Sequence, residues 1–271
     1  MPELPEVETT RSGIEPHIKN QTIVKVIVRQ PKLRWPIPAS LAKDLPGHSI
    51  SGVSRRGKYL LLKSKLGTVI IHLGMSGSLR ILKTPVPPGK HDHVDFELGS
   101  GDILRYTDPR RFGCILWEVN DLAQHPLLSK LGPEPLLEEF DSSYLHSLSR
   151  KRKAPIKTFI MDSHIVVGVG NIYANEALFM AGISPKRAAG EISKARYEKL
   201  VVAVKSVLAQ AILVGGTTLK DFTNSNGDPG YFKQSLQVYG RGGLPCNNCE
   251  KDLSEVRLGQ RATVYCSVCQ K

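Results

Sequence analysis

Two kinds of hydrophobic periodicity divide this chain. Between residues 22 and 118, apolar runs of about five to eight residues are separated by Gly, Pro, Asp and Ser. Runs of this length and spacing are typical of a β-sandwich or barrel. We therefore predict strands over 22–29, 48–54, 58–64, 67–73, 78–82, 93–98, 102–107 and 113–118.

Helical periodicity flanks this β-rich region on both sides. At the start of the chain, apolar residues recur at helical spacing and predict an amphipathic helix from Pro5 to near Pro16. A segment rich in Pro and Gly at 126–136 indicates a domain boundary. Beyond it we predict three helices, at 141–150, 170–181 and 193–213. The tail from residue 240 onward forms a separate small unit.

Charge narrows the class of partner. Lys and Arg exceed Asp and Glu by 12, and the pI is about 9.5. Such an excess favours a polyanion, most often nucleic acid, although some enzymes are merely basic. No apolar run is long enough to cross a membrane, and the N-terminus is not a signal peptide. We expect a cytoplasmic protein, associated with the nucleoid if the source is bacterial.

The cysteines indicate a metal site. Cys246 and Cys249 form one CxxC pair, and after a spacer of sixteen residues Cys266 and Cys269 form a second one. Two such pairs complete a tetrahedral site for one structural Zn²⁺, and the spacer suits a β-hairpin with Arg261 near its turn. Two redox CxxC sites are the alternative, but no βαβ pattern surrounds them. We expect Cys114, alone in an apolar strand, to be buried.

The first six residues, Met1-Pro2-Glu3-Leu4-Pro5-Glu6, carry possible chemistry. If Met1 is removed, Pro2 becomes a secondary amine with two carboxylates close behind it, and such an amine can form a Schiff base. While Met1 is attached, the Pro2 nitrogen is an amide and cannot. The alternative is an ordinary helix start, in which Pro and Glu are common.

Three other groups of residues suit a nucleic-acid ligand. Gly170 and Asn171 begin a helix whose first N–H groups can bind an anion. Met75 and the segment Arg110-Arg111-Phe112 lie on turns, where they could enter a distorted duplex or simply pack under the turn. Basic residues occur at 55, 56, 58, 150–153 and 157. Together they form either a track that binds DNA or simply a solvated face. His91-Asp92-His93 is interpreted as structural rather than metal-binding.

Nine motifs occur in one order: PELPEVET, RRGKYL, HLGMSGS, DPRRFG, LGPEPL, VGVGNIYANE, GGTTLKDF, QVYGR and the four-cysteine unit. In this the whole chain resembles the bacterial formamidopyrimidine-DNA glycosylases, which remove 8-oxoguanine and ring-opened purines. The resemblance implies an α+β multidomain fold. It comprises an N-terminal β-sandwich with a first helix (1–130), a helix–two-turn–helix domain with a lesion-binding loop at 217–232 (131–236), and a zinc finger (237–271).

The resemblance also implies roles for single residues. Pro2 attacks C1′ and expels the base, and β,δ-elimination then cuts the strand on both sides. Glu3 is the proton donor, Glu6 supports the site, Lys58 donates a proton in β-elimination, and Arg261 does so in δ-elimination while holding a phosphate. The implied DNA contacts, including a void-filling arginine two residues before the Phe, are His72, Met75, His91, Arg110, Phe112, Lys157 and Asn171. The implied partner is damaged double-stranded DNA, bound by a monomer.

Two other functions remain open at this point. An endonuclease VIII-type enzyme has the same architecture but acts on oxidised pyrimidines. The PELPE start, the PRRF turn and the long 217–232 loop argue against it. A non-enzymatic zinc-finger DNA-binding protein would have the same tail, and its N-terminus would be incidental.

Overall fold

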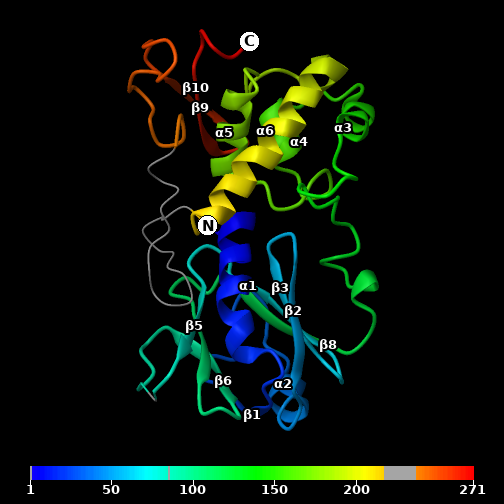
Figure 1. Ribbon diagram of the computed structural model, residues 1–271, viewed down its shortest axis with the longest axis vertical. Coiled ribbons are helices and arrows are strands. Elements are labelled where there is room, and N and C mark those ends of the chain that lie inside the picture. The colour runs from blue at the N-terminus through cyan, green and yellow to red at the C-terminus, as the bar shows by residue number, and fades with distance from the viewer. Residues whose placement is uncertain (1, 85, 217–235) are drawn as a thin grey trace. The chain divides into compact units, whose positions relative to one another are not determined.

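The computed structural model describes residues 2–84, 86–216 and 236–271 (Figure 1). They form two compact units. The N-terminal unit holds residues up to 129 together with 214–216, and the C-terminal unit holds 130–213 and 236–271. The predicted loop at 217–232 lies outside the described residues. Each unit has its own core, so each is described separately.

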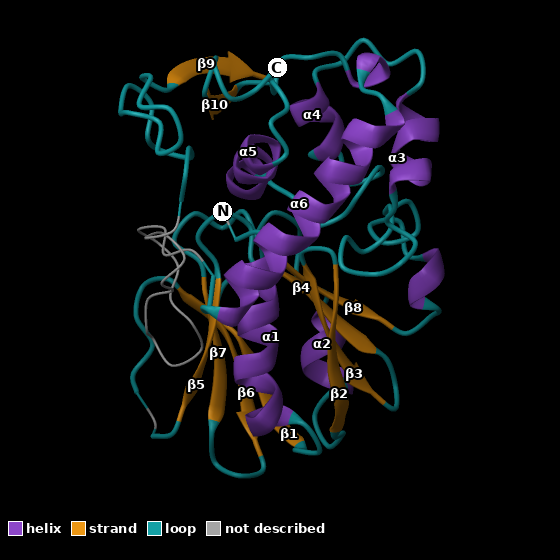
Figure 2. Ribbon diagram, turned by 45° about the horizontal axis from the view of Figure 1, so that its top comes forward, coloured by secondary structure: helices purple, strands orange, loops and turns teal. Residues whose placement is uncertain are grey.

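The N-terminal unit is a sandwich of two four-stranded antiparallel sheets (Figure 2). One sheet has the order β1 (Ile23–Val28), β6 (Asp92–Leu98), β7 (Ile103–Thr107), β5 (Ser78–Leu82). The other has the order β2 (Ile50–Arg56), β3 (Tyr59–Ser64), β4 (Thr68–His72), β8 (Cys114–Glu118). Apolar side chains from both sheets share one buried core. All eight predicted strands are confirmed, as is the burial of Cys114.

Helix α1 (Leu4–Ile18) contacts β2 and β5, which are edge strands of the two sheets (Figure 2). The helix ends at Ile18, two residues past Pro16 and close to the predicted end. The Lys19 amide still donates to the Glu15 carbonyl oxygen at 3.0 Å, and Ile18 is fully buried. Burial of the last turn therefore outweighs the local cost of the proline.

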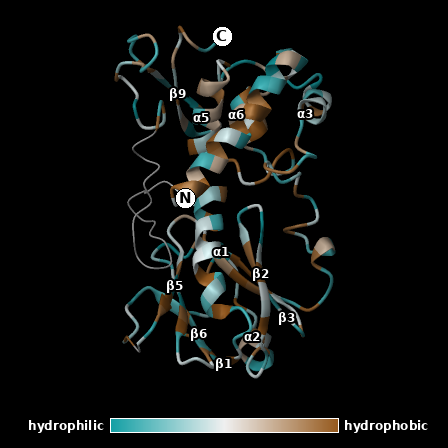
Figure 3. Ribbon diagram, in the orientation of Figure 1, coloured by the Kyte–Doolittle hydropathy of each residue, from teal (hydrophilic) through white to brown (hydrophobic). Residues whose placement is uncertain are grey.

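The C-terminal unit contains α3 (Ser142–Ser149), α5 (Asn171–Met180) and α6 (Lys194–Leu213), which confirm the three predicted helices. Asp141 caps α3 by accepting a hydrogen bond from the Tyr144 amide at 2.7 Å. Helix α6 contacts α3 and α5 through its buried apolar face and keeps a polar face (Figure 3). No helix among the described residues is long and apolar enough to cross a membrane.

Strands β9 (Ser254–Leu258) and β10 (Arg261–Tyr265) form the predicted hairpin, and α5 packs on β10. Four short elements were not predicted, because one or two turns give too few positions to show a period. They are α2 (Ala39–Asp44), α4 (Ile156–Ile160) and the 3₁₀ turns Leu122–Gln124 and Ala189–Glu191. The observed elements agree with the predicted α+β fold class.

Candidate active site and DNA-binding residues

The N-terminal segment is held by a reciprocal capping box at the start of α1. The Glu3 side chain accepts from the Glu6 amide, and the Glu3 amide donates to Glu6 Oε2 at 2.8 Å. Both glutamate side chains are almost fully buried, and Pro2 is buried as well. Pro5 is tolerated in the first turn because its missing N–H would have no helical partner there. Two buried carboxyl groups therefore lie directly behind Pro2 in a fixed backbone geometry.

Gly216 lies against Glu6. A Cβ on Gly216 would come 3.0 Å from Glu6 Oε1, and its φ of +81° is in the left-handed region. Any side chain at 216 would meet the Glu6 carboxyl group and strain the backbone. Glycine here is thus favoured both by the buried glutamate and by the positive φ.

Lys58 occupies the tight turn between β2 and β3, beside Gly57, whose φ is +57°. Arg55 fixes this turn from one side by donating from Nη1 to the Gly57 carbonyl oxygen at 2.8 Å. The same guanidinium donates from Nε to Glu8 Oε2 on α1 at 2.9 Å. The helix that follows Pro2 and the turn that presents Lys58 are therefore joined through Arg55.

Glu8 also receives a hydrogen bond from Arg11, at 2.6 Å. Burial by itself would raise the pKa of Glu8, but the hydrogen bonds and charges of Arg11 and Arg55 outweigh it and hold this pKa below its usual value. Glu8 is therefore a structural anion between two arginines rather than a proton donor.

His72 ends β4 opposite Tyr59 of β3, with the two ring centroids 4.9 Å apart. The Gly74 amide donates to His72 Nδ1 at 2.9 Å, so Nδ1 is an acceptor and the ring proton is on Nε2. Burial, followed by the charges of Lys58 and Arg34, lowers the pKa of His72 to about 4. At neutral pH His72 is an uncharged N–H donor.

Met75 lies on the turn after β4, and Arg110-Arg111-Phe112 lies on the turn after β7. Phe112 is 48% exposed, and the Arg110 guanidinium carbon stands 4.9 Å from the centre of its ring. Arg111 adopts a left-handed φ of 55°. An exposed phenylalanine stacked with an arginine at a turn does not stabilise the core, which favours the predicted role of a wedge over packing under the turn.

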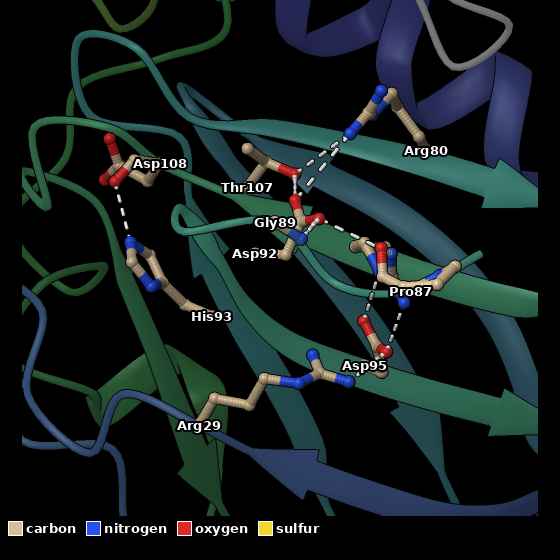
Figure 4. Close-up of polar contacts among 10 residues, drawn as sticks. Arg29, Arg80, Pro87, Gly89, Asp92, His93, Asp95, Thr107 and Asp108 are labelled. Atoms are coloured by element: carbon tan, nitrogen blue, oxygen red, sulfur yellow. Dashed lines mark hydrogen bonds and ion pairs between the residues drawn. The ribbon is translucent and has the colours of Figure 1, made fainter.

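His91 is exposed just before β6, on a segment anchored by a buried ion network (Figure 4). Asp92 Oδ2 accepts from the Gly89 amide at 2.8 Å and pairs with Arg105 at 3.4 Å. Arg105 also pairs with Asp95, which in turn binds Arg29. His93 is buried and within 2.8 Å of the Asp108 carbonyl oxygen. Asp92 and His93 are therefore held by contacts within the sandwich.

In the C-terminal unit, Gly170 is the N-cap of α5 and Asn171 its first residue. The Asn171 side-chain oxygen is buried without a hydrogen-bond partner. One turn later, the Asn175 side chain donates to the Asn171 carbonyl oxygen at 2.6 Å and accepts from the Val264 amide at 3.1 Å. The start of α5 is thus tied to strand β10, and Asn171 retains polar capacity for a ligand.

Arg261 is the exposed first residue of β10. The two residues before it, Gly259 and Gln260, have φ values of +54° and +61°. Two consecutive positive φ angles in a two-residue loop are the pattern of a type I′ hairpin. The predicted position of Arg261 beside the hairpin turn is confirmed.

Lys157 is fully buried, which sequence reasoning did not foresee for a residue expected to contact DNA. Its Nζ donates to the Ala262 carbonyl oxygen at 2.9 Å and to Thr263 Oγ1 at 2.7 Å. Its visible role is to attach β10 to α4, and its DNA contact stays a prediction. Glu176, which the sequence analysis did not single out, accepts from the amides of residues 237, 238 and 239 at 2.8–2.9 Å. An acidic residue inside the apolar segment of α5 was the available signal.

The four cysteines of the tail meet at one point. Their sulfur atoms all lie within 4.8 Å of one another, with Cys246–Cys269 at 4.0 Å and Cys249–Cys266 at 3.4 Å. A tetrahedral Zn²⁺ with bonds of about 2.3 Å requires sulfur–sulfur separations of about 3.8 Å. The residues therefore fit one structural zinc ion. The Cys269 amide lies 3.4 Å from Cys266 Sγ and would support that thiolate.

Three family profiles match this chain. They are the formamidopyrimidine-DNA glycosylase N-terminal domain (residues 1–115), the H2TH domain of the same enzymes (131–223), and the zinc finger found in FPG and IleRS (243–271). Together they define a DNA glycosylase with a helix–two-turn–helix domain and a zinc finger. The chain belongs to the formamidopyrimidine-DNA glycosylase family.

Full-length relatives support this. The formamidopyrimidine-DNA glycosylase of Marinobacter nauticus is 60% identical over 100% of both chains. A mutant of Lactococcus lactis FPG in complex with DNA containing Fapy-dG has a TM-score of 0.92 and 33% identity over 100% of both chains. The wild-type Lactococcus lactis protein in complex with DNA containing an oxidised pyrimidine has a TM-score of 0.90 and 33% identity, again over 100% of both chains.

Proposed function

We propose that this protein is a bifunctional DNA glycosylase and AP lyase of base excision repair that removes oxidised purines from double-stranded DNA. Family membership over the whole chain supports the reaction class. The observation that carries the residue assignment is the capping box, because it places two buried carboxyl groups directly behind Pro2. A net charge of +12 supports a DNA partner, action as a monomer and association with the nucleoid.

The reaction begins at the Pro2 nitrogen once Met1 has been removed. Its lone pair forms a bond to C1′ of the damaged nucleoside, and the C1′–N bond to the base breaks. Glu3 protonates the sugar-ring oxygen as the ring opens, which leaves an iminium ion between Pro2 and the sugar. An α-amino group has a pKa near 8 in model peptides, so about one-tenth of it is neutral at pH 7. No extreme tuning of this amine is required.

The iminium ion then acts as an electron sink for strand cleavage. Loss of a C2′ proton breaks the C3′–O bond, and a second elimination breaks the C5′–O bond. We assign Lys58 to proton transfer in the first elimination and Arg261 to the second. The zinc ion takes no part in these steps. Its cysteines hold the hairpin that presents Arg261.

The phosphates flanking the lesion are assigned to His72, Asn171 and Arg261, and His91 and Lys157 stay predicted DNA contacts without an assigned group. Two features of the structure support this: the uncharged Nε2 donor of His72, and the position of Asn171 at the start of α5, where the helix dipole favours an anion. Met75, Arg110 and Phe112 are assigned to fill the space left by the flipped nucleotide. The stacked, exposed Arg110–Phe112 pair supports this assignment.

Borohydride trapping tests the covalent step. Protein that lacks Met1 should form a trapped complex with an 8-oxoguanine duplex, and Pro2→Gly should bind that duplex while trapping far less. Intact-mass measurement identifies the processed form. Retention of Met1 in active protein would exclude Pro2 as the nucleophile. Absence of trapping with any lesion, from processed protein, would favour a non-enzymatic DNA-binding protein.

The endonuclease VIII-type alternative requires a different comparison. A related protein has been crystallised with DNA that carries an oxidised pyrimidine, so binding alone does not distinguish the two specificities. Single-turnover excision of 8-oxoguanine and thymine glycol from otherwise identical duplexes does. We expect faster excision of 8-oxoguanine, and the reverse order would support the alternative.

A further inference from the structure

One buried carboxylate links the two turns that carry Met75 and Phe112. Asp108, at the end of β7, is fully buried. Its Oδ1 accepts from Ser76 Oγ at 2.7 Å and from the Arg110 amide at 3.3 Å. Its Oδ2 accepts from the Gly113 amide at 2.9 Å and from the Tyr106 hydroxyl at 3.1 Å. Ser76 follows Met75, and Gly113 follows Phe112.

Ser76 closes this link. Its Oγ donates to Asp108 and also lies 3.2 Å from the Arg110 amide as an acceptor. The hydroxyl therefore connects the Met75 turn directly to the backbone of the Arg110–Phe112 turn. Ser76 is buried, so water does not compete for these bonds.

The two turns also touch through their backbones. A Cβ on Gly74 would overlap with the Phe112 carbonyl group and the Gly113 amide nitrogen. A Cβ on Gly113 would overlap with the Tyr106 hydroxyl and the His72 carbonyl oxygen. Glycine at 74 and 113 therefore allows the turns to approach more closely than side chains would permit. Backbone contact and the shared carboxylate make one rigid body of the two turns.

We propose that Asp108 is a positioning residue that couples these turns, so that Met75, Arg110 and Phe112 enter the duplex together as a single preformed wedge. This inference rests on the void-filling role proposed above. Three side chains ordered in advance lose less conformational entropy on insertion than three that must be ordered at the DNA. Accurate placement matters as well, since a displacement of about 1 Å can lower a rate about 100-fold.

The hydrogen-bond pattern requires a carboxylate. Asp108 receives two donors on each oxygen. An asparagine at this position would direct its NH₂ group at one of the two pairs of donors, since only its carbonyl oxygen can accept. Asp108→Asn should therefore weaken the wedge with almost no change in side-chain volume. Ser76→Ala removes only the bridge between the turns and leaves Asp108 three of its four donors.

Two substrates separate wedge formation from catalysis. An 8-oxoguanine duplex needs the wedge, because flipping leaves a gap and an unpaired base. A single strand that contains an abasic site has no such gap and reports AP lyase chemistry alone. For Asp108→Asn and Ser76→Ala we expect single-turnover cleavage of the duplex to slow by about 10- to 100-fold. Cleavage of the single strand should stay within about twofold of wild type. Fluorescence of 2-aminopurine opposite the lesion should rise less on binding.

Asp95→Asn is the matched control. Asp95 is an equally buried carboxylate in the same sandwich, paired with Arg29 and Arg105, and it contacts neither turn. Asp95→Asn should lower the melting temperature at least as much as Asp108→Asn. It should leave the ratio of the duplex cleavage rate to the single-strand cleavage rate unchanged. Full duplex activity of Asp108→Asn, or an equal loss on both substrates, would overturn the coupling role. Wild-type protein that cleaves neither substrate would instead contradict the proposed function.

Discussion

Arg55 Nε donates to Glu8 Oε2 at 2.9 Å, although the two residues are 47 positions apart in the chain. This bond joins the first helix to the strand that leads to Lys58. Through its second nitrogen Arg55 also holds the carbonyl oxygen of Gly57. One guanidinium thus sets the position of the Lys58 turn relative to the N-terminal helix. On sequence grounds Arg55 was only one residue of a basic run that could form a DNA track, and Glu8 was not singled out.

Arg55→Lys should slow catalysis more than it destabilises the fold. A lysine can pair with Glu8 but cannot also reach Gly57 with planar, fixed donors. We expect the trapping rate to fall several-fold while the free energy of unfolding changes by about 1 kcal/mol or less, as is usual for partly exposed ion pairs. A time course of borohydride trapping measures the trapping rate, and urea unfolding measures the free energy of unfolding.

Arg11→Ala is the control for that experiment, because Arg11 binds the same carboxylate but not the Lys58 turn. It should change stability by a similar amount and leave the trapping rate near wild type. Equal trapping rates for Arg55→Lys and wild type would show that the turn is positioned by other contacts.

His72 should make the fold sensitive to acid. Its pKa is about 4 in the folded protein, against an ordinary value of 6.5. Between these values the unfolded chain binds more protons than the folded one, so stability falls as pH drops below 6.5 and the loss is complete near pH 4. From about pH 7.5 to about pH 5 the free energy of unfolding should fall by about 2 kcal/mol because of His72.

His72→Gln removes the titrating group and keeps hydrogen-bonding capacity. In urea unfolding, the free energy of unfolding of the variant should fall by about 2 kcal/mol less than that of wild type over the same pH interval. An identical loss in wild type and variant would mean that His72 titrates normally in the folded protein.

The salt dependence of DNA binding distinguishes the two types of phosphate contact. His72 is neutral, so His72→Ala, which removes the donor, should weaken binding without changing the slope of log K against log salt concentration. Arg261→Gln should make the slope less negative by roughly 1, because one charged contact is lost. With about five phosphates neutralised, the wild-type slope should be roughly −4 to −5. Filter binding across salt concentrations measures it, and equal slopes for both variants would contradict the assignment of charge.

Lys157→Met should loosen the hairpin. The substitution shortens the side chain by one atom and leaves the Ala262 carbonyl and the Thr263 hydroxyl without their buried donor. Such unsatisfied groups cost about 1–3 kcal/mol. Hydrogen exchange at β9 and β10 should accelerate accordingly.

Lys205→Met is a matched control, since Lys205 also donates to a backbone carbonyl, that of Leu137 at 2.8 Å, but at an exposed position. It should leave exchange in the hairpin unchanged. If Lys157→Met exchanges at the wild-type rate, the buried ammonium group does not hold the hairpin.

Zinc removal should sharply weaken DNA binding and leave the N-terminal sandwich folded. The hairpin has a small apolar core around its cysteines and depends on the metal for its folding free energy. We expect chelator-treated protein, or Cys266→Ser, to lose one equivalent of zinc and most of its affinity for damaged duplex. Cys114→Ser, in the sandwich, should retain the zinc. Zinc analysis with a fluorescence binding assay tests this, and full affinity without zinc would contradict it.

Local sequence patterns were sufficient for much of this molecule. Alternating apolar runs predicted all eight sandwich strands, and the two CxxC pairs predicted both the metal and the hairpin. The motif order identified Pro2 and Glu3 as candidates at the helix start. The strand, metal and hairpin predictions depend on residues close together in the chain, whose spacing and backbone preferences act over one turn or one strand pair.

Contacts between distant segments depended on the tertiary structure. Asp108 became notable only when it was seen to bind Ser76. Lys157 was predicted as a DNA contact, but its burial and its bonds to β10 appeared only in the structure. In sequence, an aspartate before a Pro looks like a turn residue, and a lysine in a basic run looks like a solvated charge. Burial removes water as a competing partner, so the fold decides which single donor or acceptor each of these groups must find.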